Sequence, residues 1–585
     1  MKHENIPPNV STGGMIVKEW YKNPAVLGLF VIFSSLAVYI NSLSGDFIWD
    51  DIEQIVDNPV IKDIRNIPSF FTSDLWRLID NPTIGSYYYR PFFLFSLAVD
   101  YNLWGLNPLG YHITNLIFHA ISSFMVYLVG RRLFSNHIPA FIGSMLFAVH
   151  PIHVESIAWI SGRTDPTAAV FFLLSFYLYI LFRDGKGFIM LIFSLIAYFF
   201  SLLSKEIGIT LPLMLLVYEL SFKPQAVIQD KHSLPPLTKG GWGDFRDNKI
   251  RILQIAGIYV VISVAYLYIR ALVLGDAIGQ FSSSPPFEKR IYTSFGIILD
   301  YLRIMVLPVN LKLLYDVPLR EFFFKWQVIF SLLLFAAVFI ATLLTYRKDK
   351  MVFFMAVWFF ITILPVSNIV PLKPTMMAER YLYIPSIGMC LLGGLMFYRI
   401  YRAGSSLSLS PYLNILICLP FIILSAMTFQ RNKLWKDEVT FFAKMSEDAP
   451  QHAFSHQNLG DAYRKTGDMD KAITEWQTAI RLYPLHPEAN NSLANIALMQ
   501  GDYQEAVHRY RLALKGRPEN SESHYNLAMA LERLGNTEEA ISHYREFIKY
   551  ASPKHHDIVE QVTERLRLFD RDKGVYEGKY LNRGI

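Results

Sequence analysis

The sequence predicts an all-α membrane protein in which a polytopic helical domain is followed by a smaller α-solenoid. Three observations lead to this fold class. The chain of 585 residues is 52% hydrophobic and 15% aromatic, while only 18% of its side chains are charged. Long charge-free stretches recur as far as Arg431. After that point charge returns, together with a self-similarity of about 34 residues that is typical of stacked helix pairs.

The first apolar run predicts a membrane-spanning helix that the protein retains. No charged side chain lies between Lys22 and Asp46, and a helix through this stretch is long enough to cross a hydrocarbon core of about 30 Å. The run is longer than the apolar part of a signal peptide and lacks a small-residue cleavage site, so we expect a signal anchor. The acids Asp46, Asp50 and Asp51 follow it directly, where membrane meets water.

Further charge-free stretches extend the membrane domain over residues 1–435, with about 11 to 13 membrane helices in all. The stretches lie between Asp100 and Arg131, Arg132 and Glu155, Asp165 and Arg183, Lys186 and Lys205, Arg251 and Arg270, Lys325 and Arg347, Lys350 and Lys373, Arg380 and Arg399, and Arg402 and Arg431, with a shorter one at Ile207 to Tyr218. Asp300, Arg303 and Pro308 interrupt the segment from Ile291 to Tyr315, which we interpret as a re-entrant or interfacial helix.

The first loop, residues 46–109, is long and contains two amphipathic pieces. They run from about Ile67 to Leu78 and from Pro91 to Trp104, and we expect helices lying in the membrane interface. Trp76 and Trp104 are typical interfacial anchors.

Basic residues set the orientation by the positive-inside rule, with the N-terminus in the cytoplasm. One side receives Lys18, Lys22, Arg131, Arg132, Arg183, Lys186, the loop from Lys223 to Arg251, Arg347, Lys348, Lys350, Arg399 and Arg402. The opposite, extracytoplasmic side then receives the acids after the first span, the loop from His150 to Asp165, Lys205 with Glu206, and the loop from Lys373 to Arg380. The net charge of +6 is explained by these flanking residues. No basic run is interleaved with exposed aromatics, so we expect no nucleic-acid partner.

Residues 436–585 predict a separate domain of three repeats, about 453–486, 487–520 and 521–554. Asn458-Leu459-Gly460 recurs as Ser492-Leu493-Ala494 and as Asn526-Leu527-Ala528. This period, with small residues where two antiparallel helices touch, is the tetratricopeptide pattern. The preceding span places the repeats outside the cytoplasm. Protein binding along their concave face is the favoured role, and a passive stabilising cap is the alternative.

Ionisable side chains at membrane depth are costly, and here acids and cations from five segments reach one face. Four cations have the chemistry to hold a phosphate, and an aspartate beside them stays ionised and can accept a proton from a hydroxyl. This combination fits transfer of a group from a lipid-linked phosphate. The candidate phosphate ligands are Arg90, Arg163, Lys205 and Arg380, the candidate bases are Asp50 and Asp51, and the candidate pocket residues are Tyr89, His150, His153, Glu155, Asp165, Glu206, Glu379 and Tyr383.

The chain also resembles the GT-C glycosyltransferases, most closely the transmembrane and tetratricopeptide-repeat protein O-mannosyltransferases. The stretches that carry the resemblance are Gly45-Asp46-Phe47-Ile48-Trp49-Asp50-Asp51, Tyr89-Arg90-Pro91, His150-Pro151-Ile152-His153-Val154-Glu155-Ser156, Ser161-Gly162-Arg163-Thr164-Asp165, Ser204-Lys205-Glu206 and Ala378-Glu379-Arg380-Tyr381-Leu382-Tyr383. The resemblance implies that one of the two adjacent acids is the catalytic base. It also implies a polyprenyl-phosphate-linked sugar such as mannose as donor, and a hydroxyl acceptor, for example Ser or Thr of a protein bound near the repeats, at the extracytoplasmic face.

Several alternatives stay open at this point. His150, His153 and Glu155 have a spacing that supplies part of a metal site, so a divalent cation is an alternative, although we assign no metal ligand and no cofactor. Arg163 with Asp165, and Lys205 with Glu206, can be local ion pairs. The tyrosines Tyr87, Tyr88 and Tyr89 can be interfacial anchors. A non-enzymatic membrane scaffold that recruits envelope proteins through its repeats is the alternative function.

Overall fold

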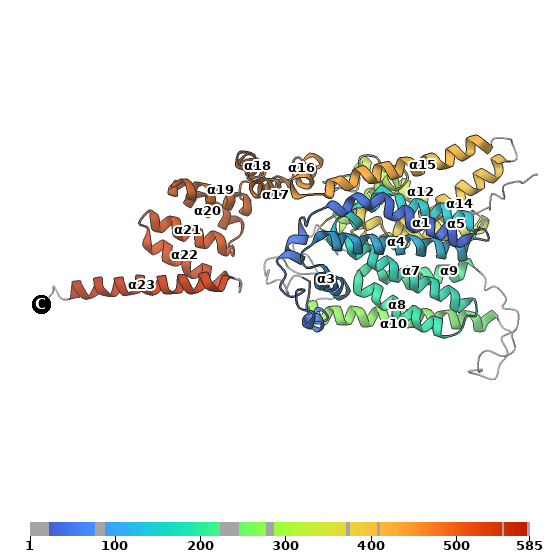
Figure 1. Cartoon of the computed structure of the whole chain (residues 1–585), viewed down its shortest axis with the longest axis horizontal. Coiled ribbons are helices and arrows are strands. Elements are labelled where there is room, and N and C mark those ends of the chain that lie inside the picture. Colours follow the sequence, from blue (N-terminus) through green and yellow to red (C-terminus); the bar gives the residue numbers. More distant parts are fainter. Residues whose placement is uncertain are drawn as a thin grey trace, which may run out of the picture.

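The computed structural model describes residues 23–75, 88–222, 245–275, 286–369, 375–405, 410–552 and 555–581. These residues form helices joined by turns, with no strand among them, so the all-α fold class is confirmed. Figure 1 shows a thick bundle of long helices with a curved arm of shorter helices leaving one end of it. Outside the described residues lie Lys18, Lys22, Trp76, Tyr87, Lys373 and most of the basic loop that begins at Lys223.

Residues up to Trp435 form the bundle. Its α-helices are α1 (Pro24–Tyr39), α2 (Ile67–Phe70), α3 (Pro91–Trp104), α4 (Pro108–Leu133), α5 (His137–Val149), α6 (Val154–Ala158), α7 (Thr164–Arg183), α8 (Ile189–Ser204), α9 (Leu211–Ser221), α10 (Phe245–Leu274), α11 (Phe287–Val306), α12 (Trp326–Lys348), α13 (Lys350–Ile363), α14 (Pro385–Ser405) and α15 (Ser410–Asn432). Short turns of other helix types between them are η2 (Ile40–Ser44), η3 (Ile52–Val56), η4 (Ile64–Asn66), η6 (Pro151–His153), η7 (Ile160–Arg163), η8 (Glu206–Thr210), η9 (Leu364–Val366), η10 (Glu379–Leu382) and η11 (Lys433–Trp435).

Five helical stretches among the described residues are long and apolar enough to cross a membrane: Pro24–Ser44, Pro108–Leu133, Ile160–Arg183, Ile252–Leu274 and Trp326–Lys348. The bent pair His137–Val149 and Pro151–Ala158 becomes a sixth if it counts as one span. The chain is therefore a multi-pass membrane protein. The figure of 11 to 13 spans stays a prediction, because helices such as α8, with 16 residues, and α13, with 14, are shorter than a full crossing requires.

Of the two segments predicted to be interfacial helices, one is mostly not helical over its described residues and the other is helical throughout. Of the segment from Ile67 to Leu78, the structure describes residues 67–75, which are helical only from Ile67 to Phe70, so the prediction of one longer helix there was wrong. The polar run Thr72-Ser73-Asp74 favours a turn instead, since these side chains compete for nearby backbone groups. The second segment, Pro91–Trp104, is helical throughout.

Helix α11 is regular over 20 residues but is not among the helices that qualify as spans. It packs against α12 and η10, and it buries Ile297, Tyr301 and Ile304 on one face. An interfacial or re-entrant position for this helix stays a prediction.

Glycines allow two helices of the bundle to lie unusually close. Helix α5 packs along α14, and a Cβ placed on Gly394 would lie 2.4 Å from the carbonyl oxygen of Pro139. A Cβ on Gly143 would lie 2.8 Å from Cα of Leu391. Small residues at such crossings let helix backbones approach inside a membrane, where van der Waals packing holds helices together.

Helix α12 covers the outside of the bundle. Only 11% of its most apolar window is buried, and Phe330, Leu333 and Leu344 are exposed along it. A long exposed apolar face on a spanning-length helix is typical of contact with lipid. This face supports the assignment of the bundle to the membrane.

The arm consists of helix pairs. Its helices are α16 (Glu438–Asp448), α17 (Ala453–Lys465), α18 (Met469–Leu482), α19 (Pro487–Gln500), α20 (Tyr503–Gly516), α21 (Ser521–Arg533), α22 (Thr537–Tyr550) and α23 (His556–Leu581). Gly467, Gly501 and Gly535 occupy the same position of successive pairs, each with a positive φ of 79° to 86° that glycine adopts without strain. The repeated architecture predicted from the sequence is present.

The arm is joined to the bundle close to the acids that follow α1. The backbone N–H of Asp46 donates to the carbonyl oxygen of Lys436 at 2.8 Å. Two further contacts join the arm to the bundle. Trp435 and Phe441 are buried in the core of the bundle. The carboxylate of Asp448 accepts a hydrogen bond from the backbone N–H of Leu313 at 2.7 Å. The solenoid therefore begins at the end of the bundle where the candidate bases lie.

Candidate active site

A pocket opens at this end of the bundle and encloses about 500 Å³ of space, part of it open to solvent. It is built by the loop after α1, the residues before α3, η7 and the start of α7, the residue between α8 and η8, and η10. The residues that line it are Asp50, Gln54, Leu75, Tyr88, Arg90, Phe93, Trp159, Ser161, Thr164, Lys205, Arg380 and Tyr381. Segments far apart in the sequence thus bring one acid and three cations to one cavity.

The turn that carries Asp50 is strained and is held by aromatic rings. Trp49 has a φ of +54°, a left-handed conformation that bulky side chains rarely adopt. Its ring stacks on Trp159 at 4.9 Å and meets Phe441 of α16 at 5.5 Å. Strained backbone persists where the surroundings fix it, and it is concentrated at functional sites. The turn places the next residue, Asp50, at the pocket wall.

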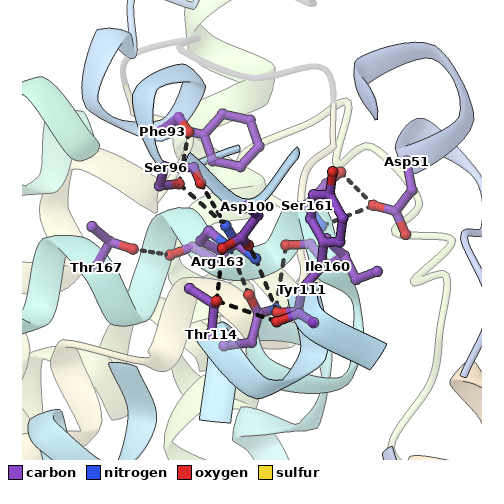
Figure 2. Close-up of polar contacts among 12 residues, drawn as sticks. Asp51, Phe93, Ser96, Asp100, Tyr111, Thr114, Ile160, Ser161, Arg163 and Thr167 are labelled. Carbon is purple, nitrogen blue, oxygen red and sulfur yellow. Dashed lines mark hydrogen bonds and ion pairs between the residues drawn. The ribbon is translucent and has the colours of Figure 1, made fainter. Parts of the chain in front are cut away.

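The neighbouring acid faces the other way. Asp51 is fully buried, and its carboxylate accepts hydrogen bonds from the Ser161 backbone N–H at 2.8 Å, the Ser161 hydroxyl at 2.5 Å and the Ile48 N–H at 3.2 Å. Figure 2 shows this carboxylate turned toward Ser161. Asp51 therefore ties the loop after α1 to η7, while Asp50 is the acid of the pair that a ligand in the pocket can reach.

Burial and mutual repulsion set the proton affinity of the pair. Desolvation and, to a lesser extent, the negative charge of Asp51 raise the pKa of Asp50 to about 7, although the positive charge of Arg380 opposes both. Desolvation also raises the pKa of Asp51 to about 7, against its hydrogen bonds from Ser161 and Ile48. A proton shared by the pair is held better on Asp50, because the oxygens of Asp51 already accept three hydrogen bonds.

Each cation of the pocket is paired with a carboxylate. Arg90 binds Glu206 at 3.0 Å, Lys205 contacts Asp165, and Arg380 contacts Glu155. These contacts place Glu155, Asp165 and Glu206 at the pocket as counterions of its cations. Burial lowers the pKa of Lys205 to about 8, with the negative charge of Asp165 acting against this change. The pairs fix the cations in place before any ligand arrives.

Aromatic rings frame the same cations. The Arg90 guanidinium lies over the ring of Tyr88 at 4.4 Å. The Arg380 guanidinium lies 5.5 Å from the ring of Trp159 and 5.1 Å from that of Tyr381. Such rings favour the charged form of an arginine and restrict its motion.

Arg163 does not reach the pocket, contrary to the expectation that it joins the phosphate ligands. Its guanidinium is fully buried and binds Asp100 at 2.6 Å, the Asn115 side chain at 2.7 Å and the Tyr111 carbonyl oxygen at 2.9 Å. Figure 2 shows it enclosed by side chains of α3 and α4. The physical reason is local: Gly162 precedes it in a tight turn, and η7 directs the side chain inward, toward Asp100.

The histidines expected to line the pocket are buried elsewhere in the bundle. His153 uses both ring nitrogens, contacting the Phe147 carbonyl oxygen and the Ser386 hydroxyl, each at 2.9 Å. His150 contacts the Met305 carbonyl oxygen at 3.0 Å. Among the residues that the structure describes, no group of three or more His, Cys, Asp or Glu side chains could hold a metal ion.

Tyr89, Tyr383 and Glu379 also lie outside the pocket. The Tyr89 hydroxyl donates to the Phe71 carbonyl oxygen at 3.0 Å, and the Tyr383 hydroxyl lies 2.7 Å from His119. Glu379 pairs with Arg431 at 2.8 Å. Desolvation raises the pKa of Glu379 to about 7 although Arg431 opposes the shift. We infer that Glu379 anchors η10, which carries Arg380.

Sequence reasoning missed several lining residues. Tyr88 was assigned to the interface, and Gln54, Trp159 and Tyr381 were not selected. Trp159 and Tyr381 lie within or next to stretches that were singled out for their charges, so they were within reach of the sequence. Gln54 lies in the π-helical turn Ile52–Val56 that follows Asp50 and Asp51, and ordinary helical spacing does not anticipate such a turn.

Comparison with known proteins adds the family context. The family model described as dolichyl-phosphate-mannose-protein mannosyltransferase matches residues 89–235, a range that holds Arg90, Lys205 and the counterions of the pocket. The tetratricopeptide-repeat model matches residues 458–510 and 500–556.

Three curated relatives extend this similarity. Protein O-mannosyl-transferase F38B6.6 of Caenorhabditis elegans is 26% identical over 506 residues, covering 83% of this chain and 67% of the relative. Protein O-mannosyl-transferase TMTC1 of Mus musculus is 27% identical over 561 residues, covering 80% and 59%. Protein O-mannosyl-transferase TMTC3 of Homo sapiens is 27% identical over 476 residues, covering 77% and 50%.

The chain thus spans between half and two thirds of the length of these relatives. The match runs through both the membrane bundle and the repeats. The resemblance stated from the sequence is confirmed: along most of its length, this chain is similar to protein O-mannosyl-transferases, and it matches both the mannosyltransferase and the tetratricopeptide-repeat family models.

Proposed function

We propose that this protein is an integral-membrane glycosyltransferase of the GT-C type. In this proposal it moves a mannose from a polyprenyl-phosphate carrier to a hydroxyl acceptor, a Ser or Thr of a protein, at the extracytoplasmic face. One observation carries the proposal. Asp50, on a strained turn, shares a membrane-edge pocket with Arg90, Lys205 and Arg380. The names of the relatives and the family model support mannose as the sugar.

The chemical step is one displacement. The acceptor oxygen attacks the anomeric carbon of the sugar while the bond from that carbon to the phosphate oxygen breaks. The phosphate leaves with the bonding electrons, and Asp50 takes the proton of the attacking hydroxyl. Attack from the face opposite the leaving group inverts the configuration. Arg380 and Lys205 stabilise the charge that develops on the departing phosphate.

The setting of the pocket suits a donor that is half lipid. The pocket lies at the end of apolar helices, with polar side chains inside it and exposed apolar side chains on α10 and α12. A polyprenyl tail can stay among those helices while its phosphate reaches the cations. This arrangement supports an activated sugar that arrives within the membrane.

The repeats supply a site for the acceptor in this proposal. Helix α16 joins the solenoid to the bundle beside the turn that carries Asp50, through Trp435 and Phe441. A protein segment bound along the helix pairs would lie on the same end of the molecule as the pocket.

The test is transfer by the purified full chain reconstituted in liposomes. Label is supplied either as mannosyl polyprenyl phosphate or as a nucleotide-linked mannose, and is counted in acceptor protein from membranes. We expect incorporation from the lipid-linked donor and none from the nucleotide-linked one. No incorporation from either donor would contradict the proposal. Biological function lost on deletion of residues 436–585 but kept in Asp50→Asn would favour a scaffold instead.

A further inference from the structure

The pocket also holds polar groups that take no part in the proposed displacement. Arg90, Lys205 and Arg380 each contact a carboxylate. The Ser161 hydroxyl donates to Asp51. Since buried polar groups in folded proteins nearly always have a partner, a group in the lining that lacks one is a candidate contact for a ligand.

Two uncharged side chains of the lining, Gln54 and Trp159, each hold such a group. Gln54 is 4% exposed and Trp159 is 5% exposed, so both are closed off from bulk water. Neither Oε1 of Gln54 nor Nε1 of Trp159 has a hydrogen-bond partner among the described residues. The carbonyl oxygen is an acceptor and the indole N–H is a donor. Together they match a hydroxyl group, which both donates and accepts.

Gln54 is placed at the pocket by the turn that follows the two acids. The backbone of Ile52–Val56 forms a π-helical turn, a conformation that is frequent at functional sites. The side chain of Asn58 holds this turn, because its Nδ2 donates to the Gln54 carbonyl oxygen at 3.1 Å. Both Gln54 and Asp50 line the pocket, so the carboxamide and the candidate base come from one short segment.

Trp159 contacts both the turn of the candidate base and a cation assigned to the phosphate. Its ring stacks on Trp49, the residue before Asp50, at 4.9 Å. The Arg380 guanidinium lies 5.5 Å from the same ring. In an inverting displacement, the base and the departing phosphate lie on opposite sides of the sugar. A sugar held between Asp50 and Arg380 therefore lies beside Trp159.

We propose that the Gln54 carboxamide and the Trp159 indole N–H form the subsite that binds hydroxyl groups of the donor's sugar. This inference rests on the proposed function and names the residues that recognise the sugar rather than the phosphate. One sugar hydroxyl donates to Oε1 of Gln54, and a sugar oxygen accepts from Nε1 of Trp159. These bonds favour the carrier that bears a sugar over the bare carrier, because the bare carrier leaves both buried groups unpaired.

The experiment measures thermal unfolding of the purified full chain in detergent, with mannosyl polyprenyl phosphate and, separately, with polyprenyl phosphate. A ligand that binds the folded state raises the unfolding temperature. The ratio of the two apparent affinities isolates the contribution of the sugar. We expect the wild type to bind the mannosyl lipid about tenfold more tightly, which corresponds to the net gain from one or two hydrogen bonds.

Gln54→Leu removes the carboxamide but keeps a side chain of similar size, and Trp159→Phe removes the N–H but keeps an aromatic ring. We expect each change to lower the affinity ratio several-fold and the double change to bring it close to one, with the affinity for polyprenyl phosphate unchanged.

The matched controls are Gln457→Leu on α17 and Trp435→Phe. Gln457 is nearly as buried as Gln54, and the Nε1 of Trp435 is likewise unpaired within the described part of the chain. Neither control residue is among the described residues that line the pocket. We expect both control variants to keep the wild-type ratio.

The outcomes separate this inference from the function on which it rests. An unchanged ratio in both Gln54→Leu and Trp159→Phe, or equal binding of the two lipids by the wild type, would overturn the sugar subsite alone. A raised KM for acceptor protein with an unchanged ratio would assign the two groups to the acceptor and overturn the subsite as well. The absence of any stabilisation of the wild type by either lipid would contradict the proposed donor class, and the subsite with it.

A second variant covers a failure of Gln54→Leu to fold. Gln54→Asn keeps the carboxamide but shortens its reach, so it should also lower the ratio several-fold. A wild-type ratio in both Gln54→Asn and Trp159→Phe would then overturn the subsite.

Discussion

Trp49 stacks on Trp159 with ring centroids 4.9 Å apart and planes 18° from parallel. The stack holds the residue before Asp50 in a left-handed conformation that costs on the order of 1–3 kcal/mol. Phe441, on the first helix of the arm, packs against the same indole at 5.5 Å. The position of the candidate base thus depends on a contact that only the joined bundle and arm can make.

Phe441→Ala is expected to lower kcat by about tenfold, because an energy difference near 1.4 kcal/mol at this contact corresponds to a tenfold change in rate. The lost ring lets Trp49 relax and moves Asp50 away from the acceptor. Phe454→Ala, which alters an exposed ring of α17, is the control and should leave kcat unchanged. Equal kcat values for Phe441→Ala and the wild type would show that the stack does not position the base.

Activity is expected to rise with pH through about 7 and to fall above about 8. Asp50 must be ionised to accept a proton, and burial together with the charge of Asp51 raises its pKa to about 7. Lys205 must be protonated to hold a phosphate, and burial lowers its pKa to about 8. The measurement is kcat/KM against pH.

The Asp51→Asn variant tests whether Asp50 is the group that sets the acidic limb of the pH profile. Removing the negative charge of Asp51 makes ionisation of Asp50 easier, so the acidic limb should move to lower pH. Movement to higher pH, or no movement, would mean that another group is responsible for the limb.

Arg163→Ala is expected to destabilise the bundle by about 3–5 kcal/mol, because it leaves the buried carboxylate of Asp100 without its counterion. The measurement is the unfolding temperature of the purified chain and its monodisperse fraction in detergent. Donor-lipid affinity of the surviving folded fraction should match the wild type. A stable Arg163→Ala variant with weakened donor-lipid binding would contradict this structural role and indicate that Arg163 binds the donor phosphate.

Gly394→Ala is expected to lower the unfolding temperature, since its new Cβ would lie 2.4 Å from the Pro139 carbonyl oxygen in the α5–α14 crossing. The adjacent Gly393→Ala is the matched control. Its Cβ meets only the end of the Leu146 side chain, at 3.0 Å, and that side chain can move. Similar unfolding temperatures for the two variants would contradict the close crossing.

The membrane bundle and the repeat arm that follows it could be predicted from the sequence, because each leaves a pattern that neighbouring residues alone determine. Charge-free runs mark helices in lipid, and Gly467, Gly501 and Gly535 mark the turns between repeat helices. Helix ends were harder. The helix that begins at Ile67 ends at Phe70, because the turn-forming side chains that follow outweigh the amphipathic pattern.

At the candidate site, the charged residues could be predicted from the sequence, but the direction in which each side chain points could not. Arg90, Lys205 and Arg380 line the pocket as the clustering of charge suggested, whereas Arg163 turns inward to Asp100. Whether an arginine faces a cavity or a buried carboxylate depends on contacts between helices distant in sequence.

The central claim is that Asp50 is the base and Asp51 holds the loop. The most direct measurement is kcat for transfer of labelled mannose from mannosyl polyprenyl phosphate by purified Asp50→Asn and Asp51→Asn proteins of equal stability. A general base contributes about 10²- to 10⁴-fold, so Asp50→Asn should lose at least a hundredfold while Asp51→Asn loses much less. Full activity of Asp50→Asn, or the reverse order of losses, would contradict the claim.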